Sequence, residues 1–272
     1  MKNRLKLSCL VLLVFFASSG SSDSAATPSS SSTPVVSSAA SRAYHYAGRP
    51  KRKGYPDELV ILTNKGYEVG YDETREDPAW VAFRLFKVTN PMTHPRPKKF
   101  LTDTRTRARV RHQDYNRSGY DRGHMAPNYA IDTLYGAEAQ TETFFMSNIV
   151  PQRPQNNRDI WRRLEQRESN TYANRYKEIW TTVGPLFEGS TQQLPRAAIQ
   201  IPSAFYRIIV REENGRPGVI AWIIKQEAGR EGLSGFLVSV ADVERRSGLD
   251  FLSDLPDRLE RAIEDAKPSG MW

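Results

Sequence analysis

Short apolar runs, and the order in which they occur, constrain the fold of this chain most strongly. Seven runs have the length and composition of β-strands; they lie at 59–62, 67–71, 80–85, 144–150, 179–184, 205–210 and 219–224. Stretches typical of helices lie at about 157–178, 240–247 and 256–266. Because strands and helices do not alternate regularly, the sequence predicts an α+β fold in which helices flank a central, largely antiparallel sheet.

The first 54 residues have a different composition. A basic start and an apolar run from Leu7 to Ala17 are followed by small residues, which is typical of a signal peptide, predicted here over 1–19. The run is shorter than the roughly 20 residues that cross a bilayer, so we expect no stable membrane span in the mature chain; a retained anchor is the alternative. Residues 20–54, rich in Ser, Ala and Pro, are predicted to be a disordered tether. One domain is then expected over 55–272.

Cysteine content and charge restrict the classes of protein further. Cys9 is the only cysteine and lies in the predicted signal peptide, so the mature chain has no disulfide, no thiolate metal site and no cysteine nucleophile. The net charge of +8 fits a polyanionic partner such as nucleic acid, and it fits simple solubility equally well. A basic patch at 49–53 is interpreted as a solvated arm, with an accessory phosphate contact as the alternative.

One of the four histidines, His124, ends the run Asp121-Arg122-Gly123-His124. A neutral imidazole can deprotonate water near neutral pH. An arginine two residues away can stabilise charge on phosphate oxygens, and Gly123 permits a close approach that a side chain would hinder. A structural histidine bonded to a backbone carbonyl is the alternative.

A second candidate group lies on the helix predicted to begin near Asn157. Glu165 follows two turns later, about 80° from Asn157 around the helix axis, so both side chains can address one site. An amide oxygen and a carboxylate suit Mg²⁺, which keeps most of its waters. The alternative is a helix cap and a surface charge.

Together these residues resemble the DNA/RNA non-specific endonuclease family, the ββα-metal group that includes secreted bacterial nucleases and mitochondrial endonuclease G. The resemblance rests on 121–127, on Ser147-Asn148-Ile149-Val150-Pro151-Gln152, and on Asn157, Trp161, Leu164 and Glu165. Weaker similarity extends over 66–71, 80–85, 183–187, 201–206 and 243–249. It implies the ββα-metal nuclease fold for the domain.

The resemblance also implies a role for each matched residue. His124 would be the general base, and Arg122 would stabilise the pentacovalent phosphate. Asn157 would be the single direct ligand of a hydrated Mg²⁺, for which Mn²⁺ could substitute, and Glu165 would hold metal-bound waters. Three residues would support the site: Asp121, Asn148 and Gln152.

Basic residues upstream of His124 are candidates for substrate contacts. The family often has a further arginine before an aromatic residue; Arg96 is preferred here, with Lys98 as the alternative. Four arginines then alternate, so that in an extended chain they would point to one side and could follow a phosphate backbone: Arg105, Arg107, Arg109 and Arg111. A solvated basic edge strand is the alternative for this row.

These observations predict a secreted or periplasmic, Mg²⁺-dependent endonuclease that hydrolyses DNA and RNA with little sequence specificity. The resemblance implies products with 5′-phosphate and 3′-hydroxyl ends. No cluster has the ligand spacing of a zinc site. A nucleic-acid-binding protein without activity and a hydrolase of other phosphodiesters are the alternatives, and both a homodimer and an inhibitor protein are compatible with the sequence.

Overall fold

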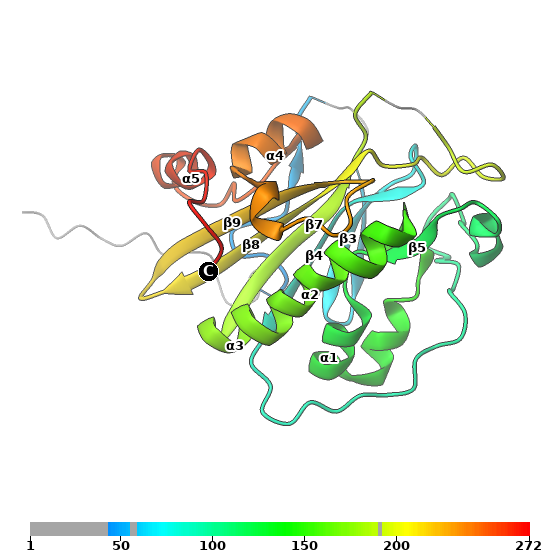
Figure 1. Cartoon of the computed structure of the whole chain (residues 1–272), viewed down its shortest axis with the longest axis horizontal. Coiled ribbons are helices and arrows are strands. Elements are labelled where there is room, and N and C mark those ends of the chain that lie inside the picture. Colours follow the sequence, from blue (N-terminus) through cyan, green and yellow to red (C-terminus); the bar gives the residue numbers. More distant parts are fainter. Residues whose placement is uncertain (1–42, 55–58, 190–191) are drawn as a thin grey trace, which may run out of the picture. The chain divides into compact units, whose positions relative to one another are not determined.

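The computed structural model describes residues 43–54, 59–189 and 192–272. Its centre is an antiparallel sheet in the order β10-β9-β8-β7-β4-β3-β2 (Figure 1). The strands are β2 Val60–Asn64, β3 Tyr67–Asp72, β4 Asp77–Phe86, β7 Glu178–Leu186, β8 Ala204–Glu213, β9 Arg216–Lys225 and β10 Leu237–Val238. Six of the seven predicted apolar runs fall on strands of this sheet, and the α+β prediction is confirmed.

Side chains of the central strands alternate between two apolar layers, as the pleat of a β-strand requires. In β4, Val81 and Phe83 face one core cluster, whereas Trp80 and Ala82 face the other. The first cluster is covered by α1 and by the helical segment 156–176, and the second by α4 and α5. The helices are α1 Asn128–Glu142, α2 Arg162–Arg167, α3 Ala173–Tyr176, α4 Val240–Ser247 and α5 Asp257–Glu264.

The predicted helix at about 157–178 is confirmed as a continuous helical segment that contains two π-helical turns. It consists of η3 Asn156–Trp161, α2, η4 Glu168–Tyr172 and α3. Short 3-10 turns lie elsewhere, at η1 His112–Tyr115, η2 Met146–Asn148 and η5 Leu233–Phe236. The run at 144–150 is mostly not a strand, because η2 occupies its middle and β6 begins only at Ile149.

A small two-stranded sheet carries the run that contains His124. β5 (Asp121–His124) pairs antiparallel with β6 (Ile149–Gln152), and α1 connects the two strands. The helical segment 156–176 follows β6 directly, which gives the order strand, strand, helix expected of a ββα unit. In Figure 1 this unit lies at one end of the large sheet, on the face covered by α1, α2 and α3.

Residues 43–54 belong to the folded domain and not to a tether. Tyr46 is buried in the second core cluster, and β1 (Lys51–Arg52) pairs with β11 (Leu249–Asp250). The basic side chains of this segment form ion pairs with the domain: Arg49 with Glu68, Arg52 with Asp72, and Lys53 with Asp250. The predicted boundary at residue 54 is therefore wrong, and the basic patch is no free arm. The predicted signal peptide and the rest of the tether lie outside the described residues.

None of the helices within the described ranges has the length and apolar character needed to cross a membrane.

Candidate active site

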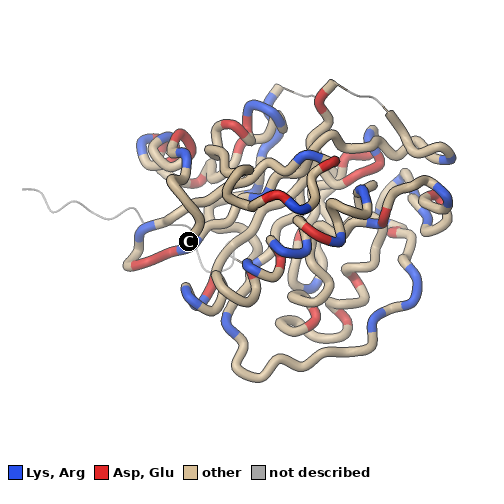
Figure 2. Tube along the Cα trace, viewed as in Figure 1, with Lys and Arg blue, Asp and Glu red and all other residues tan. Residues whose placement is uncertain are grey.

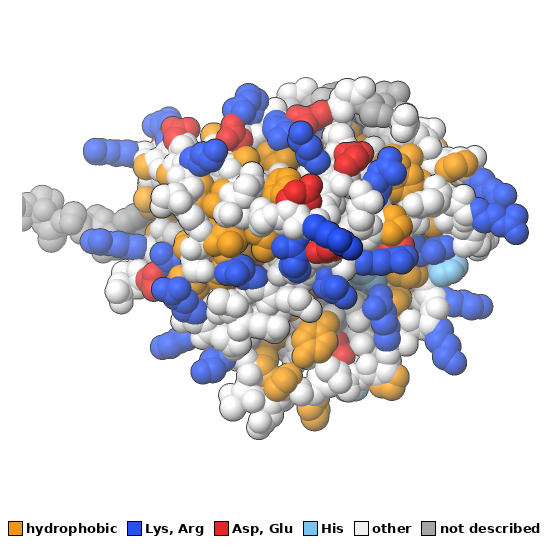
Figure 3. Space-filling view, in the orientation of Figure 1, with side chains coloured by type: hydrophobic (Ala, Val, Ile, Leu, Met, Phe, Trp, Pro, Cys, Tyr) orange, Lys and Arg blue, Asp and Glu red, His pale blue; other side chains and the backbone are white. Residues whose placement is uncertain are grey.

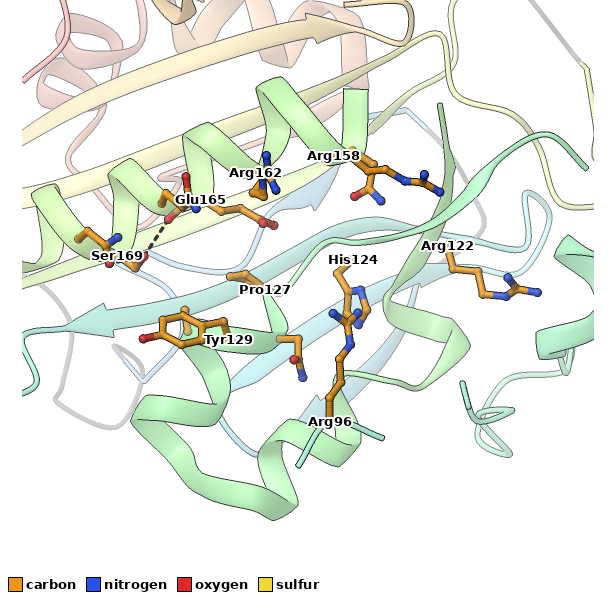
Figure 4. Close-up of a pocket in the computed structure, with 14 residues that line it drawn as sticks. Arg96, Arg122, His124, Pro127, Tyr129, Arg158, Arg162, Glu165 and Ser169 are labelled. Carbon is orange, nitrogen blue, oxygen red and sulfur yellow. Dashed lines mark hydrogen bonds between the residues drawn. The ribbon is translucent and has the colours of Figure 1, made fainter. Parts of the chain in front are cut away.

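A pocket of about 520 Å³ opens between β5 and the helical segment 156–176. It is lined by His124 from β5, by Asn157 and Glu165 from the helical segment, and by Arg96 from the loop that precedes β5 (Figure 4). The two halves of the predicted site, about thirty residues apart in sequence, thus meet at one cavity. Asn157 and Glu165 line the same cavity, although the π-helical turn changes the angle between them from that of a regular α-helix.

The imidazole of His124 is held among aromatic rings. The ring of Phe100 lies 5.2 Å and that of Phe144 lies 5.1 Å from the imidazole, measured between centroids. Its Nε2 atom is buried and has no hydrogen-bond partner among the described residues. Burial lowers the pKa of His124 to about 3, with a smaller contribution from the positive charge of Arg96. The ring is therefore neutral at physiological pH, as a general base must be.

Gly123 allows β5 to lie close against a buried side chain of β6. A Cβ atom at this position would lie 2.2 Å from the Oε1 atom of Gln152 and 2.8 Å from its Cβ. Gln152 in turn donates a hydrogen bond of 2.7 Å to Asn156, at the start of the helical segment. A glycine is thus required at position 123, because a larger residue on β5 would collide with Gln152, which connects β6 to the helical segment.

Asn148 fixes the chain directly after His124. Its Oδ1 accepts a hydrogen bond of 2.8 Å from the backbone N–H of Ala126, and its Nδ2 donates to the carbonyl groups of Ala126 and Thr143. The side chain is completely buried. It therefore ties the end of β5 to the end of α1, and it makes no contact that would suggest a chemical role.

Asp121 connects β5 to the helical segment across the mouth of the pocket. Its carboxylate accepts a hydrogen bond of 2.9 Å from Nδ2 of Asn157 and two further bonds from Arg158. Since the amide nitrogen of Asn157 is engaged in this way, its carbonyl oxygen is the atom left to face a ligand. Asp121 thereby orients Asn157 as well as the loop.

Glu165 is half-buried on α2, in front of a buried ion pair. Arg207 on β8 is completely buried, donates to Glu168, and places its Nη2 3.7 Å from the carboxylate of Glu165. Burial raises the pKa of Glu165 to about 7; the positive charge of Arg207 acts in the opposite direction, and the negative charge of Glu168 raises the pKa further. The carboxyl group of Glu165 is therefore only partly ionised at neutral pH, and a cation bound nearby would favour its ionised form.

The two candidate phosphate-binding arginines differ in their surroundings. Arg96 lies against His124 and stacks over Phe144, with its guanidinium carbon 5.3 Å from the ring centroid (Figure 4). Its loop is anchored two residues earlier, where His94 bonds to the buried carboxylate of Asp132. The other arginine, Arg122, also lines the pocket, but its guanidinium points away from His124.

The guanidinium of Arg122 is engaged by the loop that precedes β5. It donates hydrogen bonds of 3.1 and 2.6 Å to the carbonyl oxygen of His112 and one of 2.7 Å to Asn116. Figure 4 shows it at the opposite end of the pocket from Tyr129. Of the two arginines, Arg96 is the one that faces the histidine.

The four arginines of the predicted row do not lie on an extended chain. The prediction that they point to one side assumed such a chain. Residues 104–108 form turns and bends, and Arg109 has a positive φ of 50°. Arg105 is bound by Asp103 and Arg111 by Asp114, and none of the four lines the pocket. Lys and Arg are spread over much of the visible face of the molecule (Figures 2 and 3), and contact between the row and nucleic acid remains a prediction.

Several pocket residues were missed from the sequence, among them Tyr129, Arg158 and Arg162. The signal for Arg162 was available, because it precedes Glu165 by three residues and so shares a helix face with it. Arg158 directly follows Asn157 and could have been found in the same way. Tyr129 lies in the first turn of α1, a helix that the sequence analysis did not predict.

Comparison with known proteins agrees with this arrangement. A family model described as DNA/RNA non-specific endonuclease matches residues 50–258, which include every residue named above as lining the pocket. The chain belongs to this family. The family assignment accounts for the ββα unit, and it places the chain among the DNA/RNA non-specific endonucleases.

Several family members resemble the chain over most of its length. The mitochondrial nuclease EXOG of Danio rerio is 30% identical over 75% of the chain, which spans 64% of that relative. A nuclease of Nostoc sp. is 29% identical, with 80% of the chain and 82% of the relative covered. A chain in the crystal structure of the EndoG/EndoGI complex superposes with a TM-score of 0.67 at 27% identity, covering 76% of this chain and 91% of that one.

The residues present fit a hydrated hard cation and not a zinc ion. Among the described residues no group of three or more His, Cys, Asp or Glu side chains is arranged to hold a metal. The pocket instead offers the amide oxygen of Asn157 and the carboxylate of Glu165. Such a small set of oxygen donors suits Mg²⁺, which retains water ligands, whereas zinc sites take three or four protein ligands.

Proposed function

We propose that this protein is a Mg²⁺-dependent endonuclease that hydrolyses phosphodiester bonds of DNA and RNA with little sequence specificity. The observation that carries the proposal is the shared pocket, in which a neutral His124 faces Asn157 and Glu165 across a rim of arginines. A base for water, oxygen donors for a cation and positive charge for phosphate are the parts that phosphodiester hydrolysis requires.

In the proposed reaction these side chains act on one phosphodiester group. His124 accepts a proton from a water molecule as the water oxygen forms a bond to phosphorus. The bond from phosphorus to the 3′-oxygen then breaks, and the 3′-oxygen takes up a proton from solvent water, which leaves a 5′-phosphate on one product and a 3′-hydroxyl on the other. Asn157 would ligate Mg²⁺, or Mn²⁺ in its place, and Glu165 would accept hydrogen bonds from its waters. A cation held in this way would supply positive charge to the phosphodiester as it reacts.

Arg96 takes the main role in neutralising charge on the phosphate. It lies beside His124, whereas the guanidinium of Arg122 is bound to the carbonyl of His112. Arg162 lines the pocket close to Glu165 and provides a further cation for a neighbouring phosphate. To stabilise the pentacovalent phosphate, Arg122 must first break its hydrogen bonds to the loop and form new ones with the substrate.

We further propose that the protein acts outside the cytoplasm, in the medium or the periplasm, after removal of its N-terminal segment. The proposal is supported by the basic start and apolar run of residues 2–17. Amino-terminal sequencing of the protein recovered from the medium and from the periplasm tests it. An amino terminus near residue 20 supports export, and an intact Met1 on intracellular protein contradicts it.

Binding partners beyond the substrate are also part of the proposal. An inhibitor protein is supported by the EndoG/EndoGI complex, in which a structurally similar chain occurs with EndoGI. Dimerisation is a further proposal, which sedimentation of the purified chain tests directly.

The activity is tested by plasmid nicking with Mg²⁺ and with EDTA, in parallel with binding of the same plasmid. We expect nicking that requires Mg²⁺ and binding that does not. Full binding without nicking would identify a nucleic-acid-binding protein without activity. Turnover of bis(p-nitrophenyl) phosphate in preference to long DNA and RNA would identify a hydrolase of other phosphodiesters.

A further inference from the structure

An exposed aromatic residue stands inside the active-site pocket. Tyr129, in the first turn of α1, is 57% exposed and lines the pocket together with His124 and Glu165. It belongs to none of the three apolar core clusters, so packing of the core does not explain a large apolar side chain here. Figure 4 shows it on the side of Ser169, with His124 between it and Arg122.

Beyond Tyr129 the surface continues into a second hollow of about 100 Å³. The two cavities share Tyr129, Ala130, Ser169 and Asn170. Among the described residues, the hollow has no charged side chain in its wall, in which Leu85, Phe86 and Val88 lie together with polar residues such as Thr133 and Asn174. The tyrosine therefore separates a cationic, catalytic compartment from an uncharged one.

This division matches the two chemical parts of a nucleotide. A phosphate belongs with the arginines around His124, whereas the face of a base gains free energy by stacking on an aromatic ring. Amide and hydroxyl groups of Asn128, Ser169 and Asn170 border the ring and can accept any base edge through hydrogen bonds. Stacking on a ring face favours no particular base, which agrees with low sequence specificity.

We propose that Tyr129 is a stacking platform for the nucleobase next to the scissile phosphate, with the uncharged hollow receiving part of that base. The inference rests on the proposed nuclease function of the same pocket. A base inside a duplex is already stacked on both faces and must leave the helix to reach the ring. The protein therefore prefers single-stranded or locally unpaired nucleic acid at the position of cleavage.

The test compares two single strands of equal length, one with normal bases and one with abasic spacers at every position. The abasic strand keeps every phosphate and lacks every base. We expect the wild-type protein to cleave the normal strand with a kcat/KM roughly tenfold higher, a typical effect of one stacked base. Y129A should lose this ratio, Y129F should regain it because its ring face is intact, and Y129L should not.

A binding measurement in EDTA separates this inference from the nuclease proposal. Stacking on Tyr129 should quench a 2-aminopurine base in a single strand bound to the wild type and to Y129F, but not in one bound to Y129L. Equal quenching with Y129L, or an unchanged cleavage ratio in that variant, overturns the stacking role. Quenching by the wild type without any cleavage in Mg²⁺ would support the platform while contradicting the nuclease function.

Discussion

His124 on β5 and Glu165 on α2 form opposite walls of one pocket, and they differ in what lies behind them. Two phenylalanine rings surround His124, and the charge that acts on it, Arg96, has the same sign as its protonated form. Behind Glu165 lies the buried Arg207, which is shared with the equally buried Glu168. Burial favours the neutral form on both walls and shifts the two pKa values in opposite directions, to about 3 and about 7.

The difference indicates which wall is ready for the reaction before substrate arrives. A neutral imidazole is the active form of a base, so the histidine wall needs no ligand to reach its working state. Glu165 is only partly ionised at neutral pH, and a cation bound nearby would shift it toward the carboxylate. The structure thus implies that metal binding completes one wall and leaves the other unchanged.

Removal of the base should have the largest effect. H124A should lower kcat by about 10²–10⁴-fold, the usual contribution of a general base, because it removes the imidazole that lines the pocket. Cleavage of a labelled oligonucleotide measures the loss, with DNA binding and thermal unfolding of the variant as controls. Near wild-type activity in H124A would refute the assigned base.

Removal of the metal ligand tests the other wall. N157A should lose several kcal/mol of transition-state stabilisation and its response to Mg²⁺, as measured by titrating the cleavage rate with the metal. N157D, which keeps an oxygen donor at the same position, is the matched control and should still respond to Mg²⁺. An unchanged Mg²⁺ midpoint in N157A would show that the cation binds elsewhere.

The ion pair behind Glu165 should matter for stability. R207M leaves the buried carboxylate of Glu168 without its cationic partner, which should lower the free energy of unfolding by about 3–5 kcal/mol. Urea unfolding at neutral pH measures it, and R216M at an exposed strand end is the control, with a change below about 0.5 kcal/mol. Similar stability in both variants would mean that the buried pair is dispensable.

The packing behind the histidine wall should contribute less. G123A places a methyl group against Gln152 and should cost about 1–3 kcal/mol of stability, as overpacking does. G235A is the matched control, because a Cβ there meets nothing within 4 Å. If both alanine variants unfold at the same urea concentration, the close approach of β5 and β6 has no energetic role.

The pH profile should report the glutamate wall alone. As the pH falls through about 7, Glu165 takes up a proton and can no longer accept hydrogen bonds from metal-bound water, so kcat/KM at low Mg²⁺ should decline below that pH. High Mg²⁺ should move the decline to lower pH, because a cation favours the carboxylate. His124 stays neutral well below this range. A decline that persists in E165Q would assign it to another group.

Strands and helices could be predicted from the sequence where their local apolar pattern agrees with the packing of the folded chain. The strands at 67–71 and 205–210 and the helix at 240–247 have apolar spacing that tertiary contacts reinforce. The pairing of His124 with Asn157 and Glu165 was predicted through the resemblance to a known family, since each half of the site was weak evidence by itself.

Features that depend on distant contacts could not be predicted. α1 contains Gly136 at a φ of 87°, which interrupts its helical pattern. Residues 43–54 look polar, yet Tyr46 gains burial from strands far away in sequence. The chain turns at the arginine row, where Arg105 forms hydrogen bonds with Asp103. The guanidinium of Arg122 binds a backbone carbonyl group, and a pattern of side chains in the sequence cannot reveal such a partner.

Digestion of DNA and RNA by the purified chain across a Mg²⁺ titration, with analysis of the product ends, tests the central claim most directly. We predict that cleavage of both substrates rises with Mg²⁺ to a plateau, stops in EDTA, and yields 5′-phosphate and 3′-hydroxyl ends. Cleavage that persists in EDTA, or binding of both substrates without cleavage at any Mg²⁺ concentration, would contradict it.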